Sequence, residues 1–226
     1  MEVVQHFIFA FSIVPVVVAA LVGLVRYRRL GRTQRYLLVL VLFALAMEVT
    51  SRAVMRYQQS NLFLVPIDTV LEFSMLALMY RRALRPGRLS RLIPGVAALF
   101  VLGSALTYSP RLDTVQFSPV QRFLESVLVL VFVGVYFYRE VKRPVITRRL
   151  ERAPMFWVSS GLLLYFSSSL LIFLSSNYVL NLSVALSRRV WAIHALLYIF
   201  LNTLYTIALW LPAHGEGAHG PEVTQS

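Results

Sequence analysis

Apolar residues form long runs along this chain, and the runs are separated by short polar segments rich in arginine. Seven of the runs are long enough for a helix that crosses the hydrocarbon core of a bilayer, which takes about 20 residues. The pattern therefore predicts an all-α polytopic membrane protein, a seven-transmembrane-helix bundle over residues 1–211 followed by a short flexible tail over 212–226. We place the seven segments approximately at Val3–Val25, Tyr36–Tyr57, Asn61–Tyr80, Leu92–Tyr108, Ser118–Tyr138, Pro154–Leu174 and Arg189–Leu211.

The composition favours a membrane protein over a soluble one. Of the 226 residues, 58% are apolar and 14% are charged, and the mean hydropathy is +0.70. A soluble chain averages about 45–50% apolar and about 25% charged residues. The seven segments leave no room for a soluble catalytic domain. There are no cysteines, which excludes disulfides, thiolate metal sites and cysteine nucleophiles. The beginning Met1-Glu2 lacks the basic region of a signal peptide, so the first segment is expected to be a retained helix.

The basic residues predict the orientation of the bundle. The net charge is +12, and 16 of the 22 basic residues lie in three alternate short loops, whereas the loops between them carry three. The positive-inside rule then puts the N-terminus outside and the C-terminus in the cytoplasm. The charge is thus assigned to topology and to the lipid bilayer as a partner, not to nucleic acid. The residues of the three loops are Arg26, Arg28, Arg29, Arg32 and Arg35; Arg81, Arg82, Arg85, Arg88 and Arg91; and Arg139, Lys142, Arg143, Arg148, Arg149 and Arg152.

Several ionisable and polar residues fall inside the apolar segments. Such residues are costly in hydrocarbon, so each one is a hypothesis for a functional site. At 1.5 Å per residue from the outer helix ends, the charged ones lie between about 6 and 16 Å deep, all in the outer half of the membrane. The candidate residues for binding a ligand or proton are Glu48, Arg52, Asp68, Glu72, Arg122, Glu125, His194, Tyr198 and Asn202.

The spacing of these residues predicts shared helix faces. The pairs Glu48/Arg52, Asp68/Glu72 and Arg122/Glu125 are each three or four residues apart, which brings both members of a pair to one face. Facing lipid would be unfavourable, so we expect these faces to turn inward and to form an outward-facing polar pocket. Two further polar stripes have the same period, one at His194, Tyr198, Asn202 and Tyr205, the other at Gly161, Tyr165, Ser168 and Ile172.

The charges inside the segments do not balance. Four carboxylates share the outer half with two arginines, which leaves two carboxylates without an obvious partner. A proton, a bound cation or a cationic ligand is expected to neutralise them, above all at Glu72, the deepest carboxylate, four residues from Asp68. Glu48–Arg52 has an alternative interpretation as an ion pair that only holds its helix in the bundle.

Known chemistries can be tested against the residues. A retinal receptor is excluded because the only lysine, Lys142, lies in a loop. A zinc hydrolase needs about three converging ligands, yet His194 is the only histidine well inside a segment, so no metal and no cofactor are predicted. An intramembrane hydrolase, with Ser160 or Ser168 beside His194, stays a lesser alternative because no GxSxG motif is present. The protein is not expected to be an enzyme.

Two functions remain open. In the first, a receptor-like sensor binds a small molecule, a cation or a proton in the outward-facing pocket and signals to a cytoplasmic partner. In the second, a small secondary transporter couples its substrate to protons or cations through the carboxylates. A transporter needs a path through both halves of the membrane, and the inner half offers only Asn202, Tyr205 and apolar residues. That difference favours the sensor.

Three stretches carry a resemblance to a protein group. They are Ile67–Phe73 (IDTVLEF), Ser159–Ser167 (SSGLLLYFS) and Leu201–Trp210 (LNTLYTIALW). They resemble stretches of uncharacterised stand-alone seven-transmembrane-helix bacterial membrane proteins, which are similar to the membrane input modules of sensor histidine kinases. The resemblance implies the seven-helix fold, a multi-pass location in the bacterial inner membrane and a signalling setting. It implies no ligand and no catalytic residue, and without an output domain a signalling role needs a separate partner.

Overall fold

The computed structural model describes residues 11–58, 61–108, 119–142, 150–182 and 184–212, and every regular element among them is helical. The predicted all-α class is confirmed. Two short 3-10 turns, η1 (Tyr27–Arg29) and η2 (Leu150–Arg152), precede α3 and α7. The α-helices in these described ranges are α2 (Ile13–Val25), α3 (Arg32–Gln58), α4 (Leu64–Ala83), α5 (Arg88–Thr107), α6 (Pro119–Lys142), α7 (Pro154–Leu182) and α8 (Val184–Trp210).

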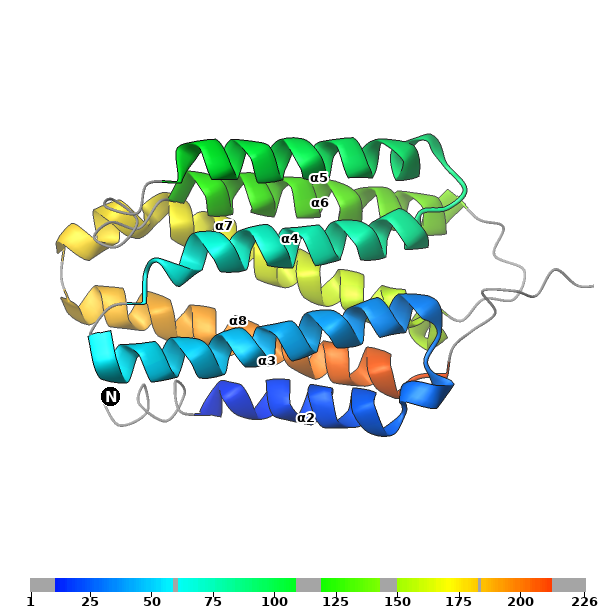
Figure 1. The fold of residues 1–226 in the computed structure, drawn as a ribbon, viewed down its shortest axis with the longest axis horizontal. Coiled ribbons are helices and arrows are strands. Elements are labelled where there is room, and N and C mark those ends of the chain that lie inside the picture. The colour runs from blue at the N-terminus through cyan, green and yellow to red at the C-terminus, as the bar shows by residue number, and fades with distance from the viewer. Residues whose placement is uncertain (1–10, 59–60, 109–118, 143–149, 183, 213–226) are drawn as a thin grey trace, which may run out of the picture.

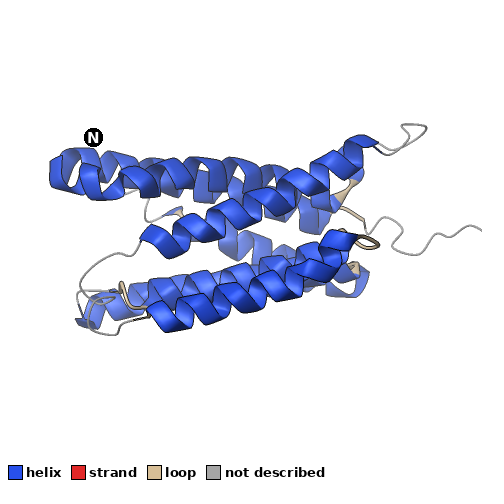
Figure 2. Cartoon of the chain, turned by 90° about the horizontal axis from the view of Figure 1, so that it is seen from above, coloured by secondary structure: helices blue, strands red, loops and turns tan. Residues whose placement is uncertain are grey.

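The helices form an elongated bundle in which successive helices run in opposite directions (Figures 1 and 2). Helices α2, α3, α4, α6, α7 and α8 form a closed ring through neighbouring contacts, and α3 also touches α8 across α2. Helix α5 packs outside the ring against α4. The alternation brings the arginine-rich turns after α2 and α4 to the same end of the bundle (right in Figure 1). We call this the arginine-rich end.

Five helical segments are long and apolar enough to cross a membrane, which indicates a membrane protein. They are Arg32–Tyr57, Arg88–Thr107, Val120–Lys142, Pro154–Ile172 and Arg189–Trp210. Two of the predicted segments do not reach this standard within the described residues. Helix α2 has 13 described residues, and the 20 residues of α4 include Asp68, Glu72, Arg81 and Arg82.

The distribution of side chains also suits a membrane. Glu125, Ser159 and Asn202 are buried, with exposed fractions of at most 1%. Large apolar side chains face outward instead; Leu99 on α5 and Leu171 on α7 are 72% and 68% exposed. A soluble monomer rarely exposes contiguous apolar surface on this scale, so lipid is the expected surrounding of these faces.

The helices extend beyond the apolar segments. Helix α7 continues to Leu182 instead of ending at Leu174, and α8 begins at Val184 instead of Arg189. Arg139 and Lys142, assigned to a loop from the sequence, lie in the last turn of α6. The length of an apolar run indicates how much of a helix matches the hydrocarbon core of a bilayer. Backbone hydrogen bonds can continue the same helix through the polar residues on either side. Residues 3–10 of the first predicted segment and 213–226 of the predicted tail lie outside the described residues.

Aromatic contacts fix α4 against α5, α6 and α7. The ring centroid of Phe73 lies 4.4 Å from that of Phe100 on α5 and 6.0 Å from that of Phe132 on α6. Tyr80 packs on Phe132 as well, and its hydroxyl lies 2.8 Å from Ser159 Oγ on α7. These contacts fix the rotation of α4 about its own axis, and that rotation sets the direction in which the predicted carboxylates point.

Helices α7 and α8 approach closely at Gly161. A Cβ atom at this position would lie 3.0 Å from Leu201 Cδ1 and 3.3 Å from Leu204 Cδ1. Glycine therefore permits the close contact that puts Tyr165, one turn later on α7, beside α8.

Candidate functional site

A cavity of about 710 Å³ lies between α3, α4 and α8, with contributions from Ser12 before α2, Arg122 of α6 and Tyr165 of α7. This volume is within the usual range for pockets that bind small molecules, about 300–1,000 Å³. All the residues predicted for the site line it, except Glu125. The charged and polar lining consists of Ser12, Glu48, Ser51, Arg52, Asn61, Asp68, Glu72, Arg122, Tyr165, Trp191, His194, Tyr198, Asn202 and Tyr205.

Arg122 is the centre of a cluster of three carboxylates. Its Nη2 atom lies 2.5 Å from Asp68 Oδ2, and its Nη1 atom lies 2.8 Å from Glu72 Oε2 and 3.0 Å from Glu125 Oε2. The cluster joins α6 to α4, since Asp68 and Glu72 are one turn apart on α4. It corrects the expectation that two carboxylates lack an embedded partner, because one guanidinium serves three of them. The excess of negative charge remains.

Glu125 is the enclosed end of this cluster. Its side chain is 0% exposed and does not line the cavity. Its Oε1 atom is buried and has no hydrogen-bond partner among the described residues. Burying an ionised carboxylate with incomplete hydrogen bonding is unfavourable. Glu125 therefore helps to hold Arg122 in place, and a ligand in the cavity would not contact Glu125.

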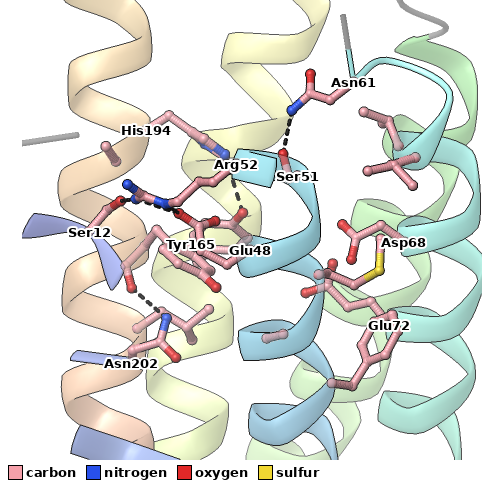
Figure 3. Close-up of a pocket in the computed structure, with 18 of the residues that line it drawn as sticks. Ser12, Glu48, Ser51, Arg52, Asn61, Asp68, Glu72, Tyr165, His194 and Asn202 are labelled. Carbon is pink, nitrogen blue, oxygen red and sulfur yellow. Dashed lines mark hydrogen bonds and ion pairs between the residues drawn. The ribbon is translucent and has the colours of Figure 1, made fainter. Parts of the chain in front are cut away.

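Glu48 and Arg52 form a second, separate cluster. Arg52 donates to Glu48 Oε1 from Nε at 2.9 Å and from Nη2 at 2.6 Å, and Nη2 also lies 3.1 Å from Ser12 Oγ. The pair lies on the side of α3 that faces α8, apart from Asp68 and Glu72 on α4 (Figure 3). The single constellation expected from the sequence is therefore two clusters, on different walls of one cavity.

His194 lies between two side chains of α7. Its Nε2 atom is 3.3 Å from the Tyr165 hydroxyl, and its Nδ1 atom is 3.3 Å from Ser169 Oγ. The serine beside His194 is thus Ser169, and not Ser160 or Ser168 as the hydrolase alternative supposed. Ser169 is 0% exposed and does not line the cavity, which suits a structural contact between α7 and α8 better than a nucleophile.

The polar stripe of α8 faces the cavity as its periodicity predicts. Tyr198, Asn202 and Tyr205 all line the cavity, whereas Phe200 is 45% exposed on another face. Asn202 Nδ2 donates to Tyr198 O at 2.9 Å, a bond within its own helix. The hydroxyl of Tyr205 is buried without a hydrogen-bond partner among the described residues. That hydroxyl has almost no accessible surface, so a ligand in the cavity reaches it only if the Tyr205 side chain turns.

The sequence pattern did not point to some of the residues that line the cavity. Asn61 donates to Ser51 near the mouth of the cavity, and Trp191 packs edge-on against His194 with ring centroids 5.7 Å apart. Ser51 lies three residues after Glu48, and Trp191 lies three residues before His194. Helical spacing therefore puts each of them on the same helix face as a predicted site residue. Ser12 had no such signal, because nothing in its apolar run relates it to Arg52.

The cavity is reached from the end where Arg52 and Asn61 lie. Side-chain exposure falls from 42% at Arg52 to 27% at Asp68, 19% at Glu72 and 14% at Arg122. We call this end of the cavity its mouth. Asp68 and Glu72 line the cavity and are partly exposed, so the carboxylates of α4 are accessible from the mouth.

The other end of the cavity is closed by packing and by Gln34. Gln34 Nε2 donates to Ala208 O at 2.8 Å and to Leu211 O at 2.9 Å, which ties the start of α3 to the end of α8. Leu37 and Val41 on α3 and Leu209 on α8 are at most 1% exposed in the same region. The two helices that wall the cavity are therefore joined at the arginine-rich end.

Comparisons of the chain with protein-family models, with curated proteins and with solved structures found no match. Within the described ranges, no group of three or more His, Asp or Glu side chains is arranged to hold a metal ion. The carboxylates of Asp68, Glu72 and Glu125 surround the guanidinium of Arg122 instead.

Proposed function

We propose that this protein is a seven-span receptor or sensor of the bacterial inner membrane, and that its cavity binds a small ligand and reports to a separate cytoplasmic partner. The observation that carries the proposal is the one-ended cavity. Its charged residues are accessible from the mouth, and its opposite end is closed by Gln34 and the packed residues beneath it. The resemblance to input modules of sensor kinases supports the same role.

A seven-span bundle accommodates α4 despite its charges. Asp68 and Glu72 are paired with Arg122 inside the bundle, and Arg81 and Arg82 lie in the last turn of α4 at the arginine-rich end. None of the four charges then has to face hydrocarbon. The positive-inside rule puts the arginine-rich end in the cytoplasm, so the mouth of the cavity opens outward.

The closed end supplies a route for the signal. Helices α3 and α8 both line the cavity, and Gln34 joins them where η1 and its arginines begin. A ligand that changes the separation of α3 and α8 would act on this joint. The basic turns beside it form the surface that a cytoplasmic partner would meet.

The transporter remains a second candidate because of the cluster around Arg122. Three carboxylates that share one guanidinium in the membrane interior are typical of sites that couple transport to protons or cations. Transport also requires a conformation in which the cavity opens at the arginine-rich end. Access to the cavity from each side of the membrane therefore distinguishes the two functions.

The orientation is tested with reporters. A reporter that is active only in the cytoplasm is expected to work when it is fused after Ser226 and to fail when it is fused before Met1. The opposite result would put the mouth of the cavity in the cytoplasm and would refute a receptor for outside ligands.

Access is tested with single cysteines, for which a chain without cysteine has no background. Ala44→Cys and Ala195→Cys put a thiol on the cavity wall, and Arg28→Cys puts one at the arginine-rich end. A membrane-impermeant charged thiol reagent is applied to vesicles of known orientation. We expect the cavity thiols to react only from the outer side and the thiol of the Arg28→Cys variant only from the cytoplasmic side. Reaction of the cavity thiols from both sides would favour the transporter.

A further inference from the structure

Among the residues that the structure describes, the unbalanced charge of the cavity lies on one wall. Glu48 and Arg52 neutralise each other on α3. On the opposite side, three carboxylates share the single charge of Arg122. Glu125 is enclosed away from the cavity, so a ligand in the cavity cannot neutralise it. Asp68 and Glu72 then exceed Arg122 by one negative charge, on a wall that a ligand can reach.

Each of these two carboxylates has an oxygen to offer. Arg122 contacts Asp68 through Oδ2 and Glu72 through Oε2. Asp68 Oδ1 and Glu72 Oε1 make no hydrogen bond or ion pair with any residue that the structure describes. Both side chains line the cavity and are partly exposed to it. Two acceptor atoms that carry the excess charge are thus directed to an occupant of the cavity.

An independent observation comes from α8. Tyr205 lines the cavity and is 4% exposed, yet its hydroxyl has no partner in the described part of the chain. A buried hydroxyl without a hydrogen bond costs about 1–3 kcal/mol. The hydroxyl has almost no accessible surface in this structure, so a ligand group removes that cost only if the Tyr205 side chain turns toward the cavity. A ligand that does so needs a polar group deep in the cavity.

The rest of the lining is suited to an apolar body. The ring of Tyr165 packs at a tilted angle against its neighbours on α8, with its centroid 5.3 Å from that of His194 and 6.3 Å from that of Tyr198. These rings form an aromatic wall that faces α3, and Phe43 and Met47 of α3 line the cavity as well. Aromatic faces attract cations as well as apolar groups. The cavity volume of about 710 Å³ is far larger than a metal ion needs.

We infer, on the basis of the proposed function, that the ligand is a small organic amine. Its ammonium group donates to the free oxygens of Asp68 and Glu72 and, once the Tyr205 side chain turns, to the Tyr205 hydroxyl. Its apolar body lies against the aromatic wall of α7 and α8. An ammonium group has three donors and no acceptor, which matches a wall of acceptors. Its single positive charge equals the excess of Asp68 and Glu72 over Arg122.

The test uses Trp191 as the reporter, because it lines the cavity and the other tryptophans, Trp157 and Trp210, do not. A protein with Trp157→Phe and Trp210→Phe is reconstituted in nanodiscs and titrated with 2-phenylethylammonium, 2-phenylethanol and phenylacetate. We expect a saturable fluorescence change with the ammonium probe and binding of the alcohol weaker by about tenfold or more, the effect of losing a charge-assisted hydrogen bond. A protein with Trp157 alone controls for partition of the probes into lipid.

Substitutions of the two carboxylates on α4 test their contact with the ammonium group. Asp68→Asn and Glu72→Gln, each made in the Trp191 protein, are expected to weaken binding of 2-phenylethylammonium by about tenfold. Glu151→Gln removes a carboxylate from η2 at the arginine-rich end and is expected to leave the affinity unchanged. Thermal unfolding of each variant identifies any that fails to fold, and two separate variants keep the contact testable.

The outcomes separate the ligand class from the function. Equal or tighter binding of the alcohol or of phenylacetate would overturn the amine while leaving a receptor cavity. The absence of a Trp191 response to the ammonium probe, or unchanged affinity in both carboxylate variants, would also overturn it. Accumulation of 2-phenylethylammonium inside proteoliposomes would support the amine and refute the receptor in favour of a transporter.

Discussion

The Nη1 atom of Arg122 lies 2.8 Å from Glu72 Oε2, and this ion pair joins α6 to α4 inside the bundle. The same nitrogen contacts Glu125, which is 0% exposed. One guanidinium therefore holds together a carboxylate that faces the cavity and a carboxylate that faces only the protein. The position of the cavity wall and the stability of the bundle depend on the same side chain.

Replacement of this arginine should strongly destabilise the protein. Arg122→Gln leaves three carboxylates without their shared cation, and breaking a buried ion pair costs about 3–5 kcal/mol. Arg52→Gln is the matched control, because its pair with Glu48 is more exposed and is expected to contribute about 0–1 kcal/mol. Unfolding of the purified variants in mixed micelles of increasing denaturing detergent measures both. A similar loss in the two variants would contradict the central role of Arg122.

The cluster also predicts a partial rescue. Adding Glu125→Gln to Arg122→Gln removes the enclosed charge that the first substitution leaves alone, so the double variant should be more stable than Arg122→Gln. The coupling is expected to be about 0.5–3 kcal/mol, the usual range for residues in contact. Simple additivity in the double-mutant cycle would mean that Arg122 and Glu125 do not depend on each other.

The inward face of α8 predicts unequal tolerance of two neighbouring positions. Asn202 is 1% exposed and bonds to Tyr198 O, whereas Phe200 is 45% exposed. Asn202→Leu should lower the free energy of unfolding by about 0.5–1.5 kcal/mol, the net value of a hydrogen bond. Phe200→Leu should change it by less than about 0.5 kcal/mol, as is usual for surface positions. Equal effects would show that Asn202 contributes nothing beyond a surface residue.

The joint between α3 and α8 predicts a local effect. Gln34→Leu removes the hydrogen bonds from Nε2 to Ala208 O and Leu211 O, and the one that Oε1 accepts from the Gly31 N–H. The loss should cost about 1–3 kcal/mol. Hydrogen–deuterium exchange should become faster in the last turn of α8. Thr203→Val is the control, because its hydroxyl bonds only to Ile199 O within α8. Unchanged exchange in the Gln34 variant would remove the proposed route from the cavity to the arginine-rich end.

The close contact of α7 and α8 predicts a steric effect at one glycine. Gly161→Val would put its Cβ 3.0 Å from Leu201 Cδ1 and 3.3 Å from Leu204 Cδ1, and overpacking of this kind costs about 1–3 kcal/mol. Gly134→Val on α6 is the control, since no atom lies within 4 Å of a Cβ there. Thermal unfolding compares the two. A loss at Gly134 as large as at Gly161 would show that the effect does not come from packing against Leu201 and Leu204.

Much of the site was predictable where a single helix determines it. Glu48 and Arg52 are four residues apart, so their ion pair follows from the helical repeat alone. The same repeat predicted that Tyr198 and Asn202 share a face, and the face does line the cavity. The helical class and most of the apolar segments followed from the length and hydropathy of the runs, because hydrocarbon sets the length of a spanning helix.

The contacts between helices were not predictable in this way. The choice of Ser169 over Ser168 as the neighbour of His194 depends on a rotation of α7 by about 100°, the angle of one residue on a helix of 3.6 residues per turn. That rotation depends on how α7 packs against α8, as at Gly161 and Leu201, and Leu201 is far from Ser169 along the chain. A local pattern carries no information about it.

The sequence by itself thus determined that the chain is helical and apolar, that its charges lie on inward faces, and that carboxylates outnumber arginines within the bundle. Only the tertiary structure decided which charges meet. It put Arg122 between α4 and α6, separated Glu48–Arg52 on another wall, and closed the cavity with Gln34. The physical reason is that the helical repeat fixes neighbours within a helix, whereas the rotation and depth of one helix against another follow from the packing of the whole bundle.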